Sequence, residues 1–290
     1  MTEIINVSFE ITQSKVFTVD SFANGISFGP HKPEPGRSER EMYMLRMQDD
    51  AELLKLRSRY AIGRSNPLDE LEKNLMRLSR KGVLGRSTIY FGLGTDPFLP
   101  FEGKFDTSMR FLELFSKYRP GLLVVQTRSP LIVIAMPALK RLGKHVSVTL
   151  GVETPDEQAV RRYTPGFPRA KERLKTAQAL RHFGIEVGIQ VAPLLPYGDW
   201  KADAVEFAQI LCDHADHLHI RPLSDGSDQG DRRSRSSESA KALARDRKFH
   251  WLRPDAANPL ITAVELLAPE KLKAPERKHL FNKQMSIFAA

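Results

Sequence analysis

The chain alternates short runs rich in β-branched residues with longer segments in which apolar residues recur at helical spacing. This alternation is typical of βαβ units around a parallel sheet, because parallel strands need long crossover connections that are usually helices. The predicted strands are residues 16–19, 60–63, 88–93, 122–127, 145–150, 186–191 and 217–221. The predicted helices are residues 67–78, 106–118, 131–142, 168–183 and 201–214. The pattern predicts an α/β fold, a partial or open (βα) barrel of the TIM type with a C-terminal tail.

A chain of 290 residues with 41% hydrophobic content can bury one large core, and an α/β barrel of this length is normally one domain. We expect the barrel over residues 1–222 and a polar, flexible, basic loop over residues 223–250. A C-terminal extension, residues 251–290, is expected to pack on the barrel, with residues 258–267 in extended conformation.

Nothing in the sequence indicates a membrane protein. No stretch of about 18 apolar residues occurs, and the first ten residues lack a basic segment of the kind that opens a signal peptide. We therefore expect a cytoplasmic chain without a membrane partner. Its single cysteine, Cys212, excludes an internal disulfide and is interpreted as a small buried hydrophobic residue.

The formal charge is +9, which allows weak, non-specific contact with nucleic acid. Much of the positive charge lies in residues 231–248, a polar segment that contains several serines. A solvated linker that binds nothing is an equally good interpretation of this segment.

Polar side chains follow several of the predicted strands. In a barrel of this kind the ligand lies at the carboxyl ends of the strands, where the loops of several strands meet. The candidate ligand-binding residues are Thr95, Asp96, Thr127, Arg128, Ser129, Thr149, Glu153 and Gln190. For Asp96 and Ser129 a second role is open and compatible with the first, because either side chain can cap the turn or helix that follows it.

No metal site is predicted. Residues 213–219 contain aspartates and histidines, but two of the histidines alternate on one strand while His214 ends the preceding helix. Only two imidazoles can then converge, whereas a structural zinc site takes four ligands.

Five segments, in order along the chain, carry a family resemblance. They are residues 25–33 (G-I-S-F-G-P-H-K-P), 93–102 (L-G-T-D-P-F-L-P-F-E), 125–132 (V-Q-T-R-S-P-L-I), 146–156 (V-S-V-T-L-G-V-E-T-P-D) and 165–196. Together they resemble the radical S-adenosylmethionine (SAM) superfamily, in its spore photoproduct lyase-like or DNA repair photolyase-like branch, over roughly residues 15–222. The resemblance implies an open (βα) barrel, and it implies that the segment around Arg128 contacts the aminoacyl end of SAM. Arg128 stands where the family usually has lysine, so the positive charge is kept but its geometry differs.

In that family, three cysteines spaced C-x3-C-x2-C hold a 4Fe-4S cluster. The corresponding positions here are Ile26, Pro30 and Pro33, and none of these side chains offers a thiolate. We therefore expect no iron-sulfur cluster, whereas SAM stays possible as a ligand.

Three functions follow from the resemblance and its missing cysteines. The first is a cluster-less homologue of the radical SAM fold, a pseudoenzyme that keeps a binding role for a nucleoside, a SAM-like molecule or nucleic acid. The second is a non-catalytic subunit that partners a cluster-containing paralogue, an active spore photoproduct lyase-like enzyme. The third is an enzyme whose iron-sulfur cluster or other cofactor is supplied in trans. Whether any catalysis remains is left open by the sequence.

Overall fold

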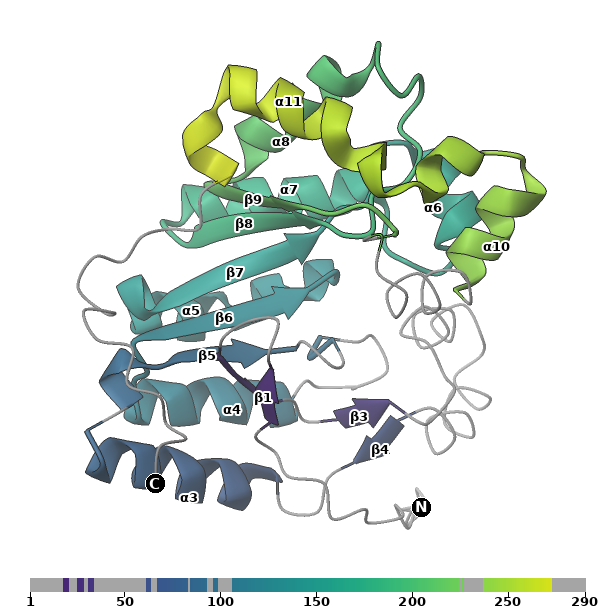
Figure 1. Cartoon of the computed structure of the whole chain (residues 1–290). Helices are drawn as coiled ribbons and strands as arrows, with labels where there is room; N and C mark the ends of the chain where they lie inside the picture. Colours follow the sequence, from purple (N-terminus) through teal and green to yellow (C-terminus); the bar gives the residue numbers. More distant parts are fainter. Residues whose placement is uncertain are drawn as a thin grey trace, which may run out of the picture.

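The computed structural model of the chain describes residues 18–20, 25–28, 31–33, 61–63, 67–82, 84–92, 96–98, 106–224, 226 and 237–272. Within these residues the centre is a seven-stranded sheet in the order β1-β2-β5-β6-β7-β8-β9 (Figure 1). Its strands are β1 (Thr18–Asp20), β2 (Gly25–Phe28), β5 (Thr88–Phe91), β6 (Leu122–Thr127), β7 (Val146–Gly151), β8 (Glu186–Val191) and β9 (His217–Ile220). β1 pairs antiparallel with β2, and every other neighbouring pair is parallel. The sheet is open, which confirms the predicted α/β fold.

The N-terminal strands differ from the prediction. A two-stranded antiparallel sheet, separate from the main one, is formed by β3 (His31–Pro33) and β4 (Ala61–Gly63). The segment 60–63, predicted as a barrel strand, therefore lies outside the main sheet. The first parallel strand of the main sheet is β2, within the segment expected to be a loop, while the predicted strand 16–19 overlaps the antiparallel β1.

Helices follow most of the parallel strands. They are α3 (Pro67–Arg80), α4 (Asp106–Lys117), α5 (Met136–Leu142), α6 (Glu157–Tyr163), α7 (Ala170–His182), α8 (Ala204–His214), α10 (Glu238–Arg245) and α11 (Asn258–Leu267). Short 3-10 helices are η2 (Leu84–Arg86), η4 (Pro130–Ala135), η5 (Gly143–His145), η6 (Phe249–Leu252), η7 (Pro254–Ala257) and η8 (Pro269–Leu272). The predicted helix 131–142 is divided into η4 and α5, because Pro137 has no N–H for an α-helical bond and fits only the first turn of α5.

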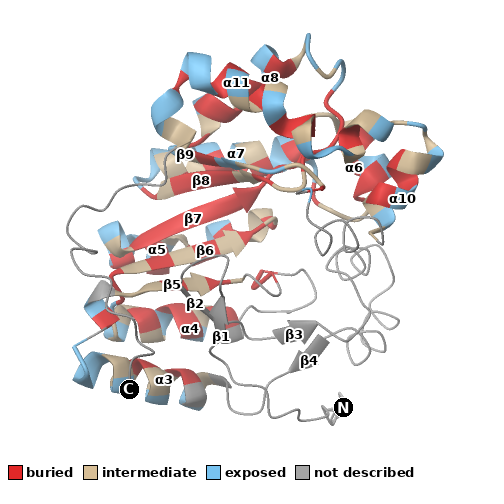
Figure 2. Ribbon diagram, in the orientation of Figure 1, coloured by how far each residue is buried: buried red, intermediate tan, exposed pale blue. Residues whose placement is uncertain are grey.

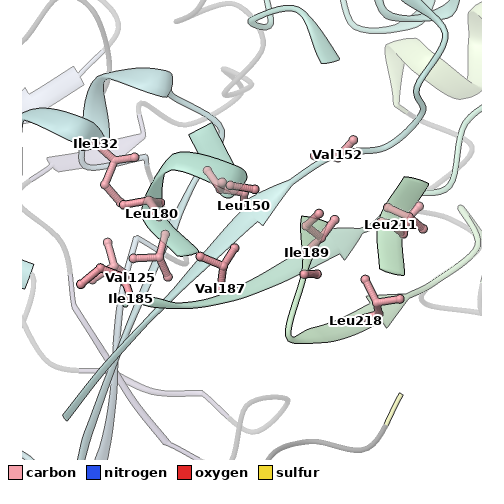
Figure 3. Close-up of a cluster of buried hydrophobic side chains, with 14 of the residues drawn as sticks. Val125, Ile132, Leu150, Val152, Leu180, Ile185, Val187, Ile189, Leu211 and Leu218 are labelled. Atoms are coloured by element: carbon pink, nitrogen blue, oxygen red, sulfur yellow. The ribbon is translucent and has the colours of Figure 1, made fainter. Parts of the chain in front are cut away.

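The pairing register decides which side chains share a face of the sheet. Phe91 packs edge-on against Phe111 of α4, with ring centroids 5.7 Å apart, so this face of β5 points to the helices. The register places the following buried residues on the same face: Ile89, Leu123, Val125, Val146, Val148, Leu150, Val187, Ile189, Val191 and Leu218. Figure 2 shows β7 and β8 largely in the colour of buried residues, whereas β5 and β6 alternate between buried and intermediate residues. Figure 3 shows part of the cluster with side chains from η4, α7 and α8. Each such side chain contributes about 1.5–3 kcal/mol to folding.

The opposite face of the sheet is polar. The register places on it Thr88, Tyr90, Leu122, Val124, Gln126, Ser147, Thr149, Gly151, Glu186, Gly188, Gln190, His217 and His219. The interior of a closed barrel is filled by bulky branched residues, and burying unpaired polar groups there costs free energy. The polar composition of this face therefore fits an open sheet better than a closed barrel.

The C-terminal extension packs on the end of the sheet that carries β8 and β9. α11 lies against α8, and η8 lies against β9 (Figure 1). Trp251 of η6 is 1% exposed and packs edge-on against Tyr197, with ring centroids 4.9 Å apart. The indole N–H of Trp200 donates to the carbonyl of Ala256 at 2.7 Å, and Lys271 Nζ donates to the carbonyl of Ala215 at 2.8 Å.

The secondary structure of this part of the chain differs from the prediction at two places. Residues 258–267 are not extended but form α11, whose Leu260, Ala263 and Val264 are buried. The expected loop 223–250 contains α10, which begins where Ser237 accepts a hydrogen bond from Ala240 N at 3.1 Å. Ser239 Oγ then donates to the carbonyl of Tyr163 at 2.7 Å, so α10 is tied to α6.

In the described part of the chain, none of the helices has the length and the apolar character that crossing a membrane requires.

Candidate functional site

A polar pocket of about 170 Å³ lies at the carboxyl edge of the parallel sheet. Its lining residues are Gly92, Gln126, Thr127, Arg128, Thr149, Gly151 and Gln190. They come from the ends of four neighbouring strands, β5 to β8, or from the residue that follows the strand. This is the edge at which open α/β sheets bind ligands, because the strand order brings their loops together there.

Two glutamines join across the pocket. Gln126 Nε2 donates to Gln190 Oε1 at 3.1 Å. In the sheet register Gln126 lies opposite Thr149 and Gln190 lies opposite Gly151, so the two amides meet above β7. Thr149 is 9% exposed, and its hydroxyl makes no hydrogen bond with the described residues.

Glycine at position 151 makes room for an arginine. A Cβ at Gly151 would come within 2.8 Å of Arg128 Cγ, so the Arg128 side chain crosses β7 in the space that a larger residue would fill. Arg128 Nε donates to Glu153 Oε1 at 2.6 Å, and its guanidinium carbon lies 5.0 Å from the centre of the Phe167 ring. The Arg128 side chain is 20% exposed and forms a wall of the pocket.

Glu153 is held between two arginines. Its other oxygen, Oε2, accepts from Arg173 Nη1 at 2.6 Å, and the same nitrogen donates to the carbonyl of Gly151 at 2.6 Å. Burial by itself raises the pKa of Glu153, but the charges and hydrogen bonds of Arg128 and Arg173 outweigh it and lower the pKa to about 2. The carboxylate is therefore ionised at neutral pH, and the three side chains together carry one surplus positive charge.

Arg173 is fully buried, and its Nε and Nη2 have no hydrogen-bond partner in the part of the chain that the structure describes. A buried guanidinium with two unpaired nitrogens is costly. The positive charge of Arg173, like that of Arg128, stabilises the ionised form of Glu153.

The side chains of Asp96 and Ser129 are buried next to the pocket, where they bond to backbone N–H groups. The Asp96 carboxylate is 1% exposed and accepts from Phe98 N at 2.9 Å, Thr127 Oγ1 at 2.6 Å and Arg128 N at 2.7 Å. Ser129, also 1% exposed, accepts from Leu131 N at 3.3 Å and so caps η4. Both side chains adopt the capping role that the sequence left open, and Asp96 also fixes the turn after β6.

The predicted site residues thus divide into three groups. Thr127, Arg128, Thr149 and Gln190 line the pocket. Asp96, Ser129 and Glu153 are buried beside it. Thr95 lies outside the described residues.

Sequence reasoning missed Gln126, Arg173 and the two glycines, Gly92 and Gly151. Strand alternation was the available signal for Gln126, because it is the polar residue on one face of an otherwise apolar strand. Helical spacing was the signal for Arg173, which precedes the buried Ala177 and Leu180 by four and seven residues and so shares their face.

Two of the three positions that the family resemblance assigns to cluster cysteines lie in strands. Ile26 lies in β2 and Pro33 in β3, while Pro30 lies outside the described residues. The single cysteine of the chain, Cys212, is buried on α8. These donors do not fit a three-cysteine cluster site. Among the described residues, no group of three or more histidine, cysteine, aspartate or glutamate side chains could hold a metal ion.

No protein-family model matches the chain. A curated relative, the uncharacterized protein ORF301 of Acidianus two-tailed virus, is 28% identical over 118 residues, which is 40% of this chain and 38% of the viral protein.

Solved structures of spore photoproduct lyase share the fold. A tyrosine-to-phenylalanine mutant matches with a TM-score of 0.60 and 12% identity, over 89% of this chain and 78% of the lyase. A cysteine-to-serine mutant matches with a TM-score of 0.55 and 13% identity, over 78% of this chain and 64% of the lyase. A double mutant with bound AdoMet and dinucleoside spore photoproduct gives the same values. The chain thus spans just under two thirds of several of these structures, and the likeness shows a common architecture.

Proposed function

We propose that the chain is a cluster-less relative of the radical SAM fold that binds a small polar ligand of the nucleoside or SAM type in the pocket above β7. One observation carries the proposal: three neighbouring parallel strands, β6 to β8, deliver polar side chains to one pocket at the edge where folds of this class bind ligands. The lyase of the same fold includes a form with bound AdoMet, which motivates the choice of SAM as the first probe.

The charge in the pocket supports a ligand with an anionic group. The guanidinium of Arg128 lines the pocket and its side chain is 20% exposed, so an anionic group of a ligand can reach it. The volume of about 170 Å³ is below the roughly 300–1,000 Å³ of typical ligand pockets. The pocket would hold one part of such a ligand, and the remainder would extend along the polar face.

The donor set supports the absence of a cluster. Iron in such clusters needs several thiolates, and the chain supplies one cysteine, which is buried on α8. No radical step is therefore assigned to this chain by itself. A cluster-containing partner protein or a cofactor supplied in trans would be needed for that chemistry.

The binding proposal is tested by thermal unfolding with SAM, S-adenosylhomocysteine, adenosine and inorganic phosphate. A ligand that binds only the folded chain should stabilise it by about 2.7 kcal/mol at 100 times its Kd. Thr149→Val should weaken the shift, because it removes a hydroxyl from the pocket at nearly constant shape. Thr176→Val, which removes a hydroxyl bonded to the Glu172 carbonyl inside α7, is the matched control and should leave the shift unchanged. Absence of any shift with all four compounds would overturn the proposal.

The cluster proposal has its own test. After anaerobic incubation with iron and sulfide, the purified chain should stay colourless and free of stoichiometric iron. Visible absorption of a 4Fe-4S protein together with about four irons per chain would contradict it. If the colourless chain instead co-purifies with a cluster-containing relative, the subunit interpretation gains support.

A further inference from the structure

We propose that the Gln126–Gln190 pair recognises the edge of a planar heterocycle that carries an N–H donor next to a hydrogen-bond acceptor, as nucleobases do. This inference rests on the proposed function and names the part of the ligand that the pocket takes. Its starting point is one hydrogen bond of 3.1 Å, which uses one donor of Gln126 and one lone-pair site of Gln190.

The bond leaves a complementary pair of groups open. Gln126 Oε1 and Gln190 Nε2 make no hydrogen bond with any described residue. One is an acceptor and the other a donor, and they belong to amides already held in contact. If both amides were rotated, Gln126 would present the donor and Gln190 the acceptor, so the donor-acceptor pair is kept in either assignment.

The backbone positions the two amides for this task. They reach each other across β7, where the facing residues are Thr149 and Gly151, and neither of these has a side chain long enough to separate them. The space beside Gly151 is already taken by Arg128, so the pocket is closed on that side. A flat ring can then lie against Thr149 with its edge toward the glutamines.

The pocket residues around the two glutamines favour a ligand edge that is polar and uncharged. The amides are uncharged, and the guanidinium of Arg128 is paired with Glu153 at 2.6 Å.

The competing interpretation is that the glutamine pair only links β6 to β8 and binds no ligand; we call such a link a brace. A brace needs only the one hydrogen bond between the amides, and its outer groups would be solvated. Such a pair would not distinguish one planar ligand from another, and this difference separates the two interpretations experimentally.

The experiment is isothermal titration of the full chain with 9-methyladenine and with 1-methyluracil, each compared with an analogue whose remaining donor is blocked. The blocked analogues are N6,N6,9-trimethyladenine and 1,3-dimethyluracil. We expect at least one free base to bind and its blocked analogue to bind about tenfold more weakly or not at all, because one hydrogen bond is lost at a desolvated edge. This comparison uses the wild-type chain and does not depend on any variant folding.

Variants of the two glutamines provide a second test. Gln126→Leu and Gln190→Leu keep the side-chain volume and remove the amide, and each should weaken base binding about tenfold. Gln178→Leu, on the exposed side of α7, is the matched control and should leave base binding unchanged. Circular dichroism of each variant checks that the fold is kept.

The outcomes separate this inference from the function on which it rests. If SAM shifts the unfolding midpoint but free and blocked bases bind equally, the edge recognition is wrong and the binding function stands. If the glutamine variants bind the free base as the wild type does, the pair is a brace. If neither SAM nor any base binds, both proposals fail.

Discussion

Glu153 determines the electrostatics of the site, although it does not line the pocket. Its carboxylate is 1% exposed and receives one guanidinium nitrogen on each oxygen, from Arg128 and Arg173. The residue connects the wall of the pocket to the first turn of α7. Removing one partner of a buried ion pair is costly because the remaining charges keep their desolvation penalty without compensation.

We expect Glu153→Gln to destabilise the chain by about 3–5 kcal/mol, since the buried Arg173 and the partly buried Arg128 lose their counter-charge. The free energy of unfolding from urea titration measures this effect. Glu206→Gln, an exposed change on α8, is the control and should stay within about 0.5 kcal/mol of the wild type. Equal stability of the two variants would show that the ion pairs contribute nothing net.

The same carboxylate predicts a pH dependence. The pKa of Glu153 lies at about 2 in the folded chain against an ordinary value of 4.5. Because the folded pKa is the lower one, the stabilisation is complete above pH 4.5 and is lost as the pH falls from 4.5 toward 2. Urea midpoints at a series of pH values should therefore fall more steeply in the wild type than in Glu153→Gln. Parallel curves for the two proteins below pH 4.5 would refute this assignment.

At the scale of the element, the positions of the strands β5 to β9 followed directly from the sequence pattern, whereas the N-terminal strands and the C-terminal helices did not. The predicted ranges 122–127 and 186–191 coincide with β6 and β8. Buried parallel strands are short apolar runs between turn residues, and that signal is local. Residues 258–267 contain β-branched residues that favour strands, yet Pro259 fits the first turn of a helix and Leu260 and Val264 repeat at helical spacing. Packing on α8, which no local pattern records, is what stabilises α11.

The candidate site, like the secondary structure, could be predicted only in part. The carboxyl ends of strands could be located from the sequence, and Thr127, Arg128, Thr149 and Gln190 do line one pocket. The hydrogen bonds between these side chains could not be predicted, because they depend on the strand register and on which residues lie opposite each other. The Arg128–Glu153 bond, over 25 positions of sequence, is an example.

The docking of the C-terminal extension gives a prediction at this scale. Trp251→Ala should destabilise the chain by about 3–5 kcal/mol, because a fully buried indole that packs on Tyr197 is replaced by a cavity. Phe249→Ala, two residues earlier in η6 and 58% exposed at the native ring, should cost less than about 0.5 kcal/mol. Differential scanning calorimetry of both variants measures the contrast. A small effect of Trp251→Ala would mean that the extension folds independently of the sheet.

At the scale of the whole molecule, charge is the dominant property. The net charge of +9 predicts weak binding of nucleic acid without sequence preference. Deleting the basic segment 231–248 would also remove α10 and the residue after it, Asp246, which pairs with Arg162 of α6 at 2.6 Å. Charge substitutions are therefore preferable to a deletion.

We expect a labelled oligonucleotide to bind at low salt, with affinity that falls linearly against salt on a double-logarithmic plot. Replacing Arg232, Arg233 and Arg235 by glutamine should reduce the slope by up to about 3 if all three contact phosphates. The same change at Lys73, Arg77 and Arg80 on α3 is the control for total charge. Absence of binding at low salt rejects the proposal, and equal slopes for both triple variants reject this segment as the contact.

The position of η8 beside β9 has a consequence for self-association. In the described chain β9 ends the sheet order, and the free edge of a sheet is a template on which a second molecule can add a strand. η8 lies along this strand, and Lys271 anchors it by donating to the carbonyls of Cys212 and Ala215. We therefore expect the contact of η8 to shield β9 from a second molecule, so loosening it should first show as growing particles in solution, before any loss of the fold.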